Sequence, residues 1–166
     1  IATGYGISTH YYNIINGLVP QDAVGFCSIM DYFAMRLCHI KKPITHTSVA
    51  ASFGLFDVKN ECFMLDKLAL LGIDEDFLPK VVASNEIVGR WNDIPICIAI
   101  GDNQASFLGS VKNNRESVLV NIGTGSQISA VGEIEQPGDG IEQRPFINGE
   151  LLICGSALCG GSAYAM

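Results

Sequence analysis

The sequence is poor in positive charge and in long apolar runs, and both absences exclude classes of function. It contains 10 Lys and Arg against 17 Asp and Glu, for a net charge of −7, and no basic stripe that could neutralise nucleic-acid phosphates. No apolar run reaches the ~18 residues of a membrane span, and neither a signal peptide nor an Asn-x-Ser/Thr glycosylation site is present. We therefore expect no nucleic-acid partner and no membrane segment.

The sequence also lacks the spacing of a metal–thiolate site and the Walker A phosphate loop. None of the cysteines pairs with His39 or His46 at a recognisable zinc spacing. Their scatter suits reduced thiols and predicts a cytoplasmic protein. The absence of Walker A excludes a P-loop fold for this segment. The cysteines are Cys27, Cys38, Cys62, Cys97, Cys154 and Cys159.

The first half of the sequence has mostly helical periodicity. Apolar residues recur at spacings of three and four from Ile14 to Leu37, which predicts two helices, with Asp22 as the N-cap of the second. A short helix or turn is expected over residues 47–55, and a third helical stretch over residues 62–71. Because the chain begins at Ile1 and stops at Met166 inside an apolar run, we expect it to be a segment of a longer polypeptide.

The second half reads mainly as strands. The near-continuous apolar run 96–100 predicts a strand that is buried on both faces. Hairpins are expected over 118–131 and over 146–154, the latter turned at Asn148-Gly149. A final helix is expected over 158–166. The polar stretch 110–115 separates the two halves and predicts a domain boundary there.

Asp102 is the first candidate for chemistry. It follows the predicted strand and precedes a predicted helix at 103–111, so it lies where open α/β sheets bind ligands. A carboxylate held there could take the proton from an attacking hydroxyl. The alternative is that Asp102 only caps the helix, a position that aspartate favours. Asn103 and Gln104 either bond substrate hydroxyls or are polar residues of the first helical turn.

Two glycine motifs follow. The turn Gly123-Thr124-Gly125 lets the backbone approach a phosphate and adds a hydroxyl donor, or it is only a hairpin turn that needs glycine. Gly160-Gly161 could bring a helix N-terminus toward a phosphate, or could serve close helix packing. A lone acid followed by a phosphate-sized glycine turn suggests phosphoryl transfer to a hydroxyl.

In their order along the chain, these segments resemble the FGGY carbohydrate kinases, members of the actin-like ATPase superfamily. The resemblance rests on GDNQASFLG at 101–109, VNIGTGSQIS at 120–129 and GSALCGGSAYA at 155–165, with IMDYFAMRLCHIKKPITHTSVAASFGLFDV upstream at 29–58. It implies an α/β, actin-like (ribonuclease H-like) two-domain architecture of which parts of both domains are present. Residues 1–111 would end the first, sugar-binding domain, and residues 112–166 would begin the second, nucleotide-binding domain.

The resemblance also implies an ATP-dependent kinase that phosphorylates a sugar or polyol hydroxyl in a cleft between the domains. Magnesium would arrive with the ATP and bridge its phosphates, with no dedicated protein site. By position, the family's roles fall on Asp102 as catalytic base, on Asn103 or Gln104 beside the sugar, on Gly123, Thr124 and Gly125 as the second phosphate loop, and on Gly160 and Gly161 beside the nucleotide.

Within the family the sequence is most similar to the sedoheptulokinases, on ATGYG at 2–6, on 29–43, on 50–54 and on 101–106. The substrate would then be a ketose such as sedoheptulose. Xylulose, gluconate and glycerol kinases are the alternatives, as is a non-catalytic sugar- or nucleotide-binding regulator on the same fold, although a regulator could lose the base that is retained here. The family's first phosphate loop and its adenosine motif are absent, so we expect the segment alone to be inactive. The sequence indicates no oligomeric state.

Overall fold

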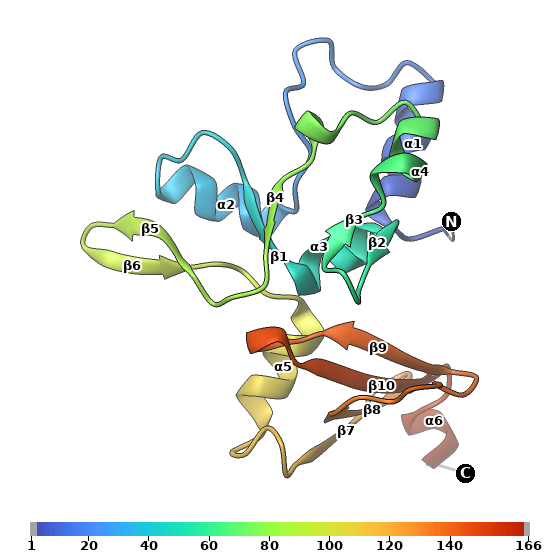
Figure 1. Ribbon diagram of the computed structural model, residues 1–166. Helices are drawn as coiled ribbons and strands as arrows, with labels where there is room; N and C mark the ends of the chain where they lie inside the picture. Colours follow the sequence, from blue (N-terminus) through green and yellow to red (C-terminus); the bar gives the residue numbers. More distant parts are fainter. Residues whose placement is uncertain (1–2, 165–166) are drawn as a thin grey trace. The chain divides into compact units, whose positions relative to one another are not determined.

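The computed structural model describes residues 3–164 as two compact units, the first ending at Gly101 and the second beginning at Asp102 (Figure 1). The sequence placed the domain boundary in the polar stretch 110–115, and the division between the two units lies about ten residues before that stretch. Helix α5 (Asp102–Ser110) therefore belongs to the second unit. The reason is packing, because the ring of Phe107 meets that of Phe146 edge-to-face at 5.7 Å. The assignment of the two parts to sugar and nucleotide domains stays a prediction.

The first unit alternates short helices with short strands. Its parallel pair β1–β4 aligns Ile44 with Lys80 and His46 with Val82, whereas its other strand pairs are antiparallel. The bounds are α1 (Gly6–Ile15), α2 (Ile29–Leu37), β1 (Ile44–His46), α3 (Thr47–Phe53), β2 (Phe56–Asp57), β3 (Cys62–Phe63), α4 (Leu65–Leu70), a 3-10 turn (Glu75–Phe77), β4 (Lys80–Val82), β5 (Ile87–Trp91) and β6 (Ile94–Cys97).

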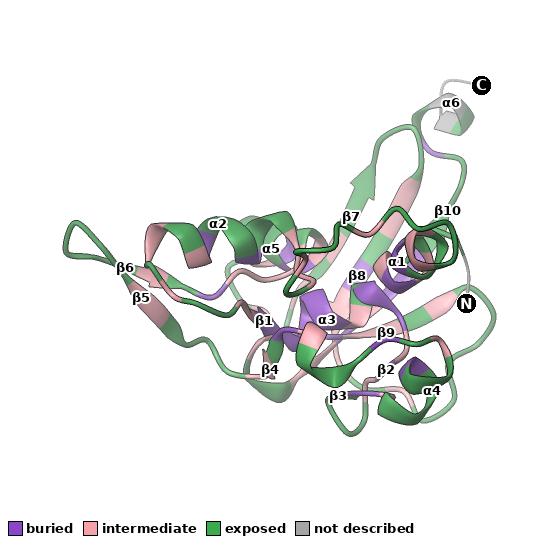
Figure 2. Cartoon of the chain, turned by 90° about the horizontal axis from the view of Figure 1, so that it is seen from above, coloured by how far each residue is buried: buried purple, intermediate pink, exposed green. Residues whose placement is uncertain are grey.

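Helix α3 is the centre of the first unit's core. Five of its seven residues are buried, and its apolar side packs with Ile7 of α1 and Leu68 of α4 (Figure 2). Phe53 stacks on Phe63, with ring centroids 6.3 Å apart. The short helix expected over 47–55 is thus confirmed, and burial of small and apolar residues from consecutive turns explains its stability better than helix propensity does.

The second unit is a four-stranded antiparallel sheet with α5 packed on it (Figure 1). Strand order is β7-β8-β10-β9, and Phe107 of α5 joins Phe146, Leu152 and Cys154 in a buried cluster. The bounds are β7 (Val118–Ile122), β8 (Ser126–Val131), β9 (Ile141–Pro145), a 3-10 turn (Ile147–Gly149), β10 (Leu151–Ala157) and α6 (Gly161–Tyr164).

Both predicted hairpins of this unit are present. The β7–β8 hairpin matches its predicted bounds within one residue. The second hairpin turns at Asn148-Gly149, where both residues have positive φ, but it is longer than expected because its first strand is β9. The last helix is observed from Gly161 to Tyr164. Ala2 of the first motif, and residues 165–166 of the predicted final helix, lie outside the described residues.

The prediction of a buried strand over residues 96–100 is wrong. The strand there, β6, ends at Cys97, pairs with β5 alone and is largely exposed, while residues 98–101 form neither helix nor strand. The cause is a two-residue turn at Asn92 and Asp93, whose positive φ values of 45° and 65° are typical of a hairpin turn. That turn commits the apolar run to a hairpin instead of to a central position in a sheet.

Two helix boundaries in the first unit also differ from the sequence prediction. The N-cap of α2 is Ser28, whose hydroxyl accepts the N–H of Asp31 at 3.0 Å, and not Asp22. The helical stretch expected over 62–71 begins only at Leu65, since Cys62 and Phe63 pair with β2. In both places a local hydrogen-bond partner outweighed the apolar periodicity.

Candidate functional site

Asp102 is the first residue of α5, and its side chain is exposed. Its Oδ1 accepts the N–H of Asn103 at 2.7 Å, so the carboxylate does bond the start of the helix. Its Oδ2 makes no hydrogen bond within the described chain. The two interpretations of Asp102 are therefore compatible, because one oxygen bonds the helix and the other faces solvent.

The two neighbours of Asp102 differ from each other. Gln104 is 3% exposed, and its Nε2 donates to the carbonyl oxygen of Pro145 at 2.8 Å. Its amide thus ties α5 to the end of β9. Asn103 is half-buried. Of the two amides predicted beside the sugar, Asn103 is the one whose side chain has no such structural bond.

The structure brings the two predicted glycine motifs together in the second unit. The N–H of Gly123 donates across the turn to the oxygen of Gly125 at 2.8 Å. The N–H of Gly161 donates to the oxygen of Gly123 at 2.7 Å. A further hydrogen bond between the two motifs was not predicted: the hydroxyl of Ser126 donates to the oxygen of Cys159 at 2.8 Å. Residues about 35 positions apart thereby form one backbone structure, which we call the glycine platform (Gly123–Ser126 with Cys159–Gly161).

Gly160 is the closest-packed member of the glycine platform. A Cβ atom on it would lie 2.5 Å from the carbonyl oxygens of both Gly123 and Gly125. A hydrogen at this position is therefore a steric requirement of the platform. The turn above it is exposed, and the N–H groups of Thr124 and Gly125 donate to no carbonyl in residues 3–164. With the Thr124 hydroxyl, these donors could hold an anion the size of a phosphate.

Arg144 on β9 supplies positive charge in the same unit. Its Nε and one terminal nitrogen donate to a single oxygen of Glu142, at 3.0 and 2.7 Å. Burial by itself lowers the Arg144 pKa, but this hydrogen bond and the negative charges of Glu142 and Asp102 outweigh burial and raise the pKa. Asp102 and Arg144 thus act on each other electrostatically, which the sequence gave no sign of.

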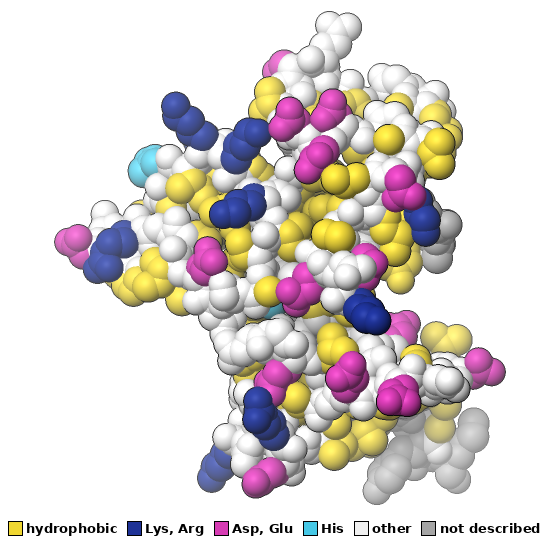
Figure 3. All heavy atoms as spheres, viewed as in Figure 1, with side chains coloured by type: hydrophobic (Ala, Val, Ile, Leu, Met, Phe, Trp, Pro, Cys, Tyr) yellow, Lys and Arg dark blue, Asp and Glu magenta, His cyan; other side chains and the backbone are white. Residues whose placement is uncertain are grey.

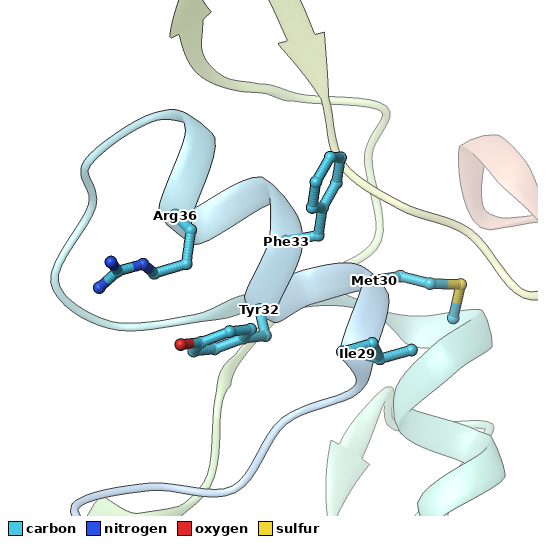
Figure 4. Close-up of a pocket in the computed structure, with 5 residues that line it drawn as sticks. All are labelled: Ile29, Met30, Tyr32, Phe33 and Arg36. Carbon is cyan, nitrogen blue, oxygen red and sulfur yellow. The ribbon is translucent and has the colours of Figure 1, made fainter.

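A hollow on α2 is lined by Ile29, Met30, Tyr32, Phe33 and Arg36, all from that one helix, and none of these was predicted in the site (Figure 4). Within residues 3–164 no three His, Cys, Asp or Glu side chains are grouped to hold a metal ion.

Acidic, basic and apolar side chains all appear in both units on the face shown in Figure 3. The six cysteines are all unpaired, with Cys154 buried and Cys62, Cys97 and Cys159 exposed. Among the described helices, none combines the length and hydrophobicity of a membrane span.

Known proteins similar in sequence to this chain are carbohydrate kinases. The chain is 30% identical over 183 aligned positions to sedoheptulokinase of Mus musculus and 27% identical to that of Homo sapiens. Each alignment covers 99% of this chain, which spans 38% of the length of each relative. No family model matches the sequence.

The fold is also that of these kinases. The ligand-bound xylulose kinase of Lactobacillus acidophilus superposes with a TM-score of 0.78 at 20% identity, over 97% of this chain and 35% of that one. At this level of identity the structural similarity establishes the fold alone, and this fold is the actin-like one expected from the sequence. The order of motifs, the alignments that span 99% of this chain and the shared fold agree, and together they support an FGGY carbohydrate kinase segment.

Proposed function

We propose that this chain is part of an ATP-dependent carbohydrate kinase that transfers the γ-phosphoryl group to a sugar hydroxyl. The observation that carries the proposal is the glycine platform, an exposed turn with unused N–H donors whose close packing tolerates only hydrogen at Gly160. Backbone amides of this kind cradle phosphates without a charged side chain. Support for a sugar as acceptor comes from the sedoheptulokinases that align over 99% of the chain.

Asp102 would be the general base. Its free Oδ2 would accept the proton of the sugar hydroxyl as that oxygen bonds to the γ-phosphorus, while the bond from phosphorus to the β,γ-bridging oxygen breaks and ADP leaves. Asn103 would bond a neighbouring hydroxyl of the sugar. The role of Gln104 would be indirect, since its amide holds α5 against β9.

Gly123, Thr124 and Gly125 would bind the ATP phosphates, and Gly160 and Gly161 would support that loop from below. Magnesium bound with the ATP would neutralise phosphate charge. Since the sequence holds one phosphate loop, we expect residues 1–166 alone to release no ADP in the presence of sugar.

The test is coupled ADP release by the full-length protein that contains this segment. Sedoheptulose, xylulose, ribulose, gluconate and glycerol are assayed in parallel, and we expect a ketose, sedoheptulose, to give the highest kcat/KM. Asp102→Asn is expected to lower kcat by about 10² to 10⁴-fold. Asp139→Asn, which neutralises an exposed carboxylate of the same unit, is the matched control and should retain wild-type kcat.

Each of the other outcomes leads to a different conclusion. Highest turnover on a different sugar would keep the kinase and replace the ketose. ATP binding by a folded protein without turnover on any of the sugars would contradict the kinase and favour a non-catalytic regulator.

A further inference from the structure

A chain of hydrogen bonds in the first unit ends on the residue that precedes Asp102. The Nε2 of His46 lies 3.2 Å from the oxygen of Ala83, and its Nδ1 lies 2.8 Å from the Oγ of Ser48. The same Ser48 Oγ accepts the N–H of Gly101 at 3.0 Å. Residues far apart in the sequence are thereby joined, since Ser48 and Gly101 are 53 positions apart.

The hydrogen bonds assign the proton positions in this chain. The N–H of Ser48 donates to His46 Nδ1 at 3.1 Å, so Nδ1 has no proton of its own. The ring proton therefore lies on Nε2 and is donated to Ala83. The Ser48 hydroxyl then donates to Nδ1, which leaves its oxygen lone pairs for the N–H of Gly101. The neutral ring is favoured further because burial lowers the His46 pKa, against smaller opposing effects of the Ala83 bond and the Glu61 and Asp31 charges.

The two ends of the chain differ in how firmly they are held. His46 is fully buried, lies in the β1–β4 pair and is the N-cap of α3, and Ser48 is 5% exposed. Residues 98–101 form no helix or strand, and the N–H of Ile98, which donates to the oxygen of Glu86 at 2.9 Å, is a second anchor of this segment. The bond from Ser48 thus holds an otherwise irregular segment where it enters α5.

We propose that Ser48, oriented by His46, is a positioning residue that fixes the Ile100–Gly101 peptide next to Asp102 and thereby aims the Asp102 carboxylate at the sugar hydroxyl. This inference rests on the proposed function, in which Asp102 is the base. Its physical basis is distance: a displacement of about 1 Å at a reacting group can cost 10²-fold in rate. Neither Ser48 nor His46 contacts substrate in this proposal, and both act through the backbone.

The experiment compares serine variants on one helix in the full-length kinase. Ser48→Ala removes the hydroxyl that bonds Gly101, whereas the control Ser52→Ala removes an α3 hydroxyl that donates to the oxygen of Val49 in the same helix. We expect Ser48→Ala to lower kcat by about 10- to 100-fold with the KM for ATP changed by less than about twofold. Ser52→Ala should retain kcat. Ser48→Thr restores a hydroxyl and is expected to recover most of the lost kcat.

A second measurement does not depend on a variant that folds. Hydrogen–deuterium exchange of wild-type full-length protein, read on a peptide that includes Gly101, should show protection of that amide. His46→Asn, which offers an oxygen near the position of Nδ1, should keep both the protection and kcat. His46→Leu, which offers no acceptor, should lose both.

The outcomes separate this inference from the proposed function. An unprotected Gly101 amide in the wild type overturns the inference, as does a Ser48→Ala protein with wild-type kcat. If Ser48→Ala lowers the melting temperature and leaves kcat intact, the network is structural only and the inference fails. An active Asp102→Asn protein would instead overturn the proposed base, whatever Ser48 does.

Discussion

Replacing Gly160 by alanine tests the glycine platform. The added methyl would lie 2.5 Å from the oxygens of Gly123 and Gly125, well inside van der Waals contact, and both obstacles are backbone. The turn must therefore move away from Gly160. Overpacking of this kind costs about 1 to 3 kcal/mol of stability. Movement of the turn also displaces the N–H groups of Thr124 and Gly125 that we assign to phosphate.

The expected effect on nucleotide binding follows from one such bond. A hydrogen bond to a charged group contributes about 1.5 to 3 kcal/mol, and 1.4 kcal/mol is a factor of ten in an equilibrium constant. Gly160→Ala should thus raise the Kd for ATP by about tenfold or more, measured by calorimetry on the full-length protein. The KM for the sugar should change by less than about twofold.

Alanine substitutions at two other glycines should perturb ATP binding less than Gly160→Ala does. A Cβ on Gly161 would lie 3.3 Å from the oxygen of Gly123, a contact that a shift of a few tenths of an ångström relieves, and a Cβ on Gly138 would meet nothing within 4 Å. The Kd for ATP should therefore rise in the order Gly138→Ala, Gly161→Ala, Gly160→Ala. Wild-type ATP affinity in a folded Gly160→Ala protein would refute the reasoning.

Three further predictions concern stability, each measured by denaturation of the full-length protein. Phe107→Ala removes a fully buried ring that packs on Phe146 and should cost about 3 to 5 kcal/mol, whereas a cost below about 1 kcal/mol would contradict the assigned core. Gly149→Ala places a side chain at φ 73° in the β9–β10 turn and should cost about 1 to 2 kcal/mol, so a neutral result would argue against that turn. Burial lowers the pKa of His10 below 6.5, so the unfolded state binds more protons and stability should fall as pH drops through and below about 6.5. Burial raises the pKa of Asp31, so Asp31 changes the pH dependence of stability in the opposite direction. The contribution of His10 is therefore measured by comparing wild type with His10→Leu, whose free energy of unfolding should depend less on pH.

The sequence predicted the second unit better than the first. The β7–β8 hairpin and the turn at Asn148-Gly149 follow from local signals, namely alternating or apolar runs separated by residues that tolerate positive φ. In the first unit, apolar periodicity gave helices near the right places but wrong starts. The cap at Ser28 and the pairing of Cys62 and Phe63 with β2 depend on partners that periodicity does not register.

The run 96–100 shows the same limit more sharply. Its composition is that of a buried strand, yet the turn at Asn92 and Asp93 folds it back on β5, and the residues that lead into Asp102 become irregular. An apolar run predicts that a segment is extended and sheltered. It does not predict which neighbour shelters it, because that choice depends on chain reversals elsewhere.

By itself, the sequence determined the chemical groups available: one acid after an apolar run, a Gly-Thr-Gly turn and a later glycine pair, in an order that identifies the family. Tertiary structure alone decided how they are used. It brought Gly160 beneath a turn 35 residues earlier, gave the Gln104 amide to Pro145, and connected Gly101 through Ser48 to a buried histidine. The physical reason is that these are contacts between segments distant in the chain. Local propensity fixes the backbone conformation of a few residues, whereas the partner of a hydrogen bond is set by packing of the whole unit.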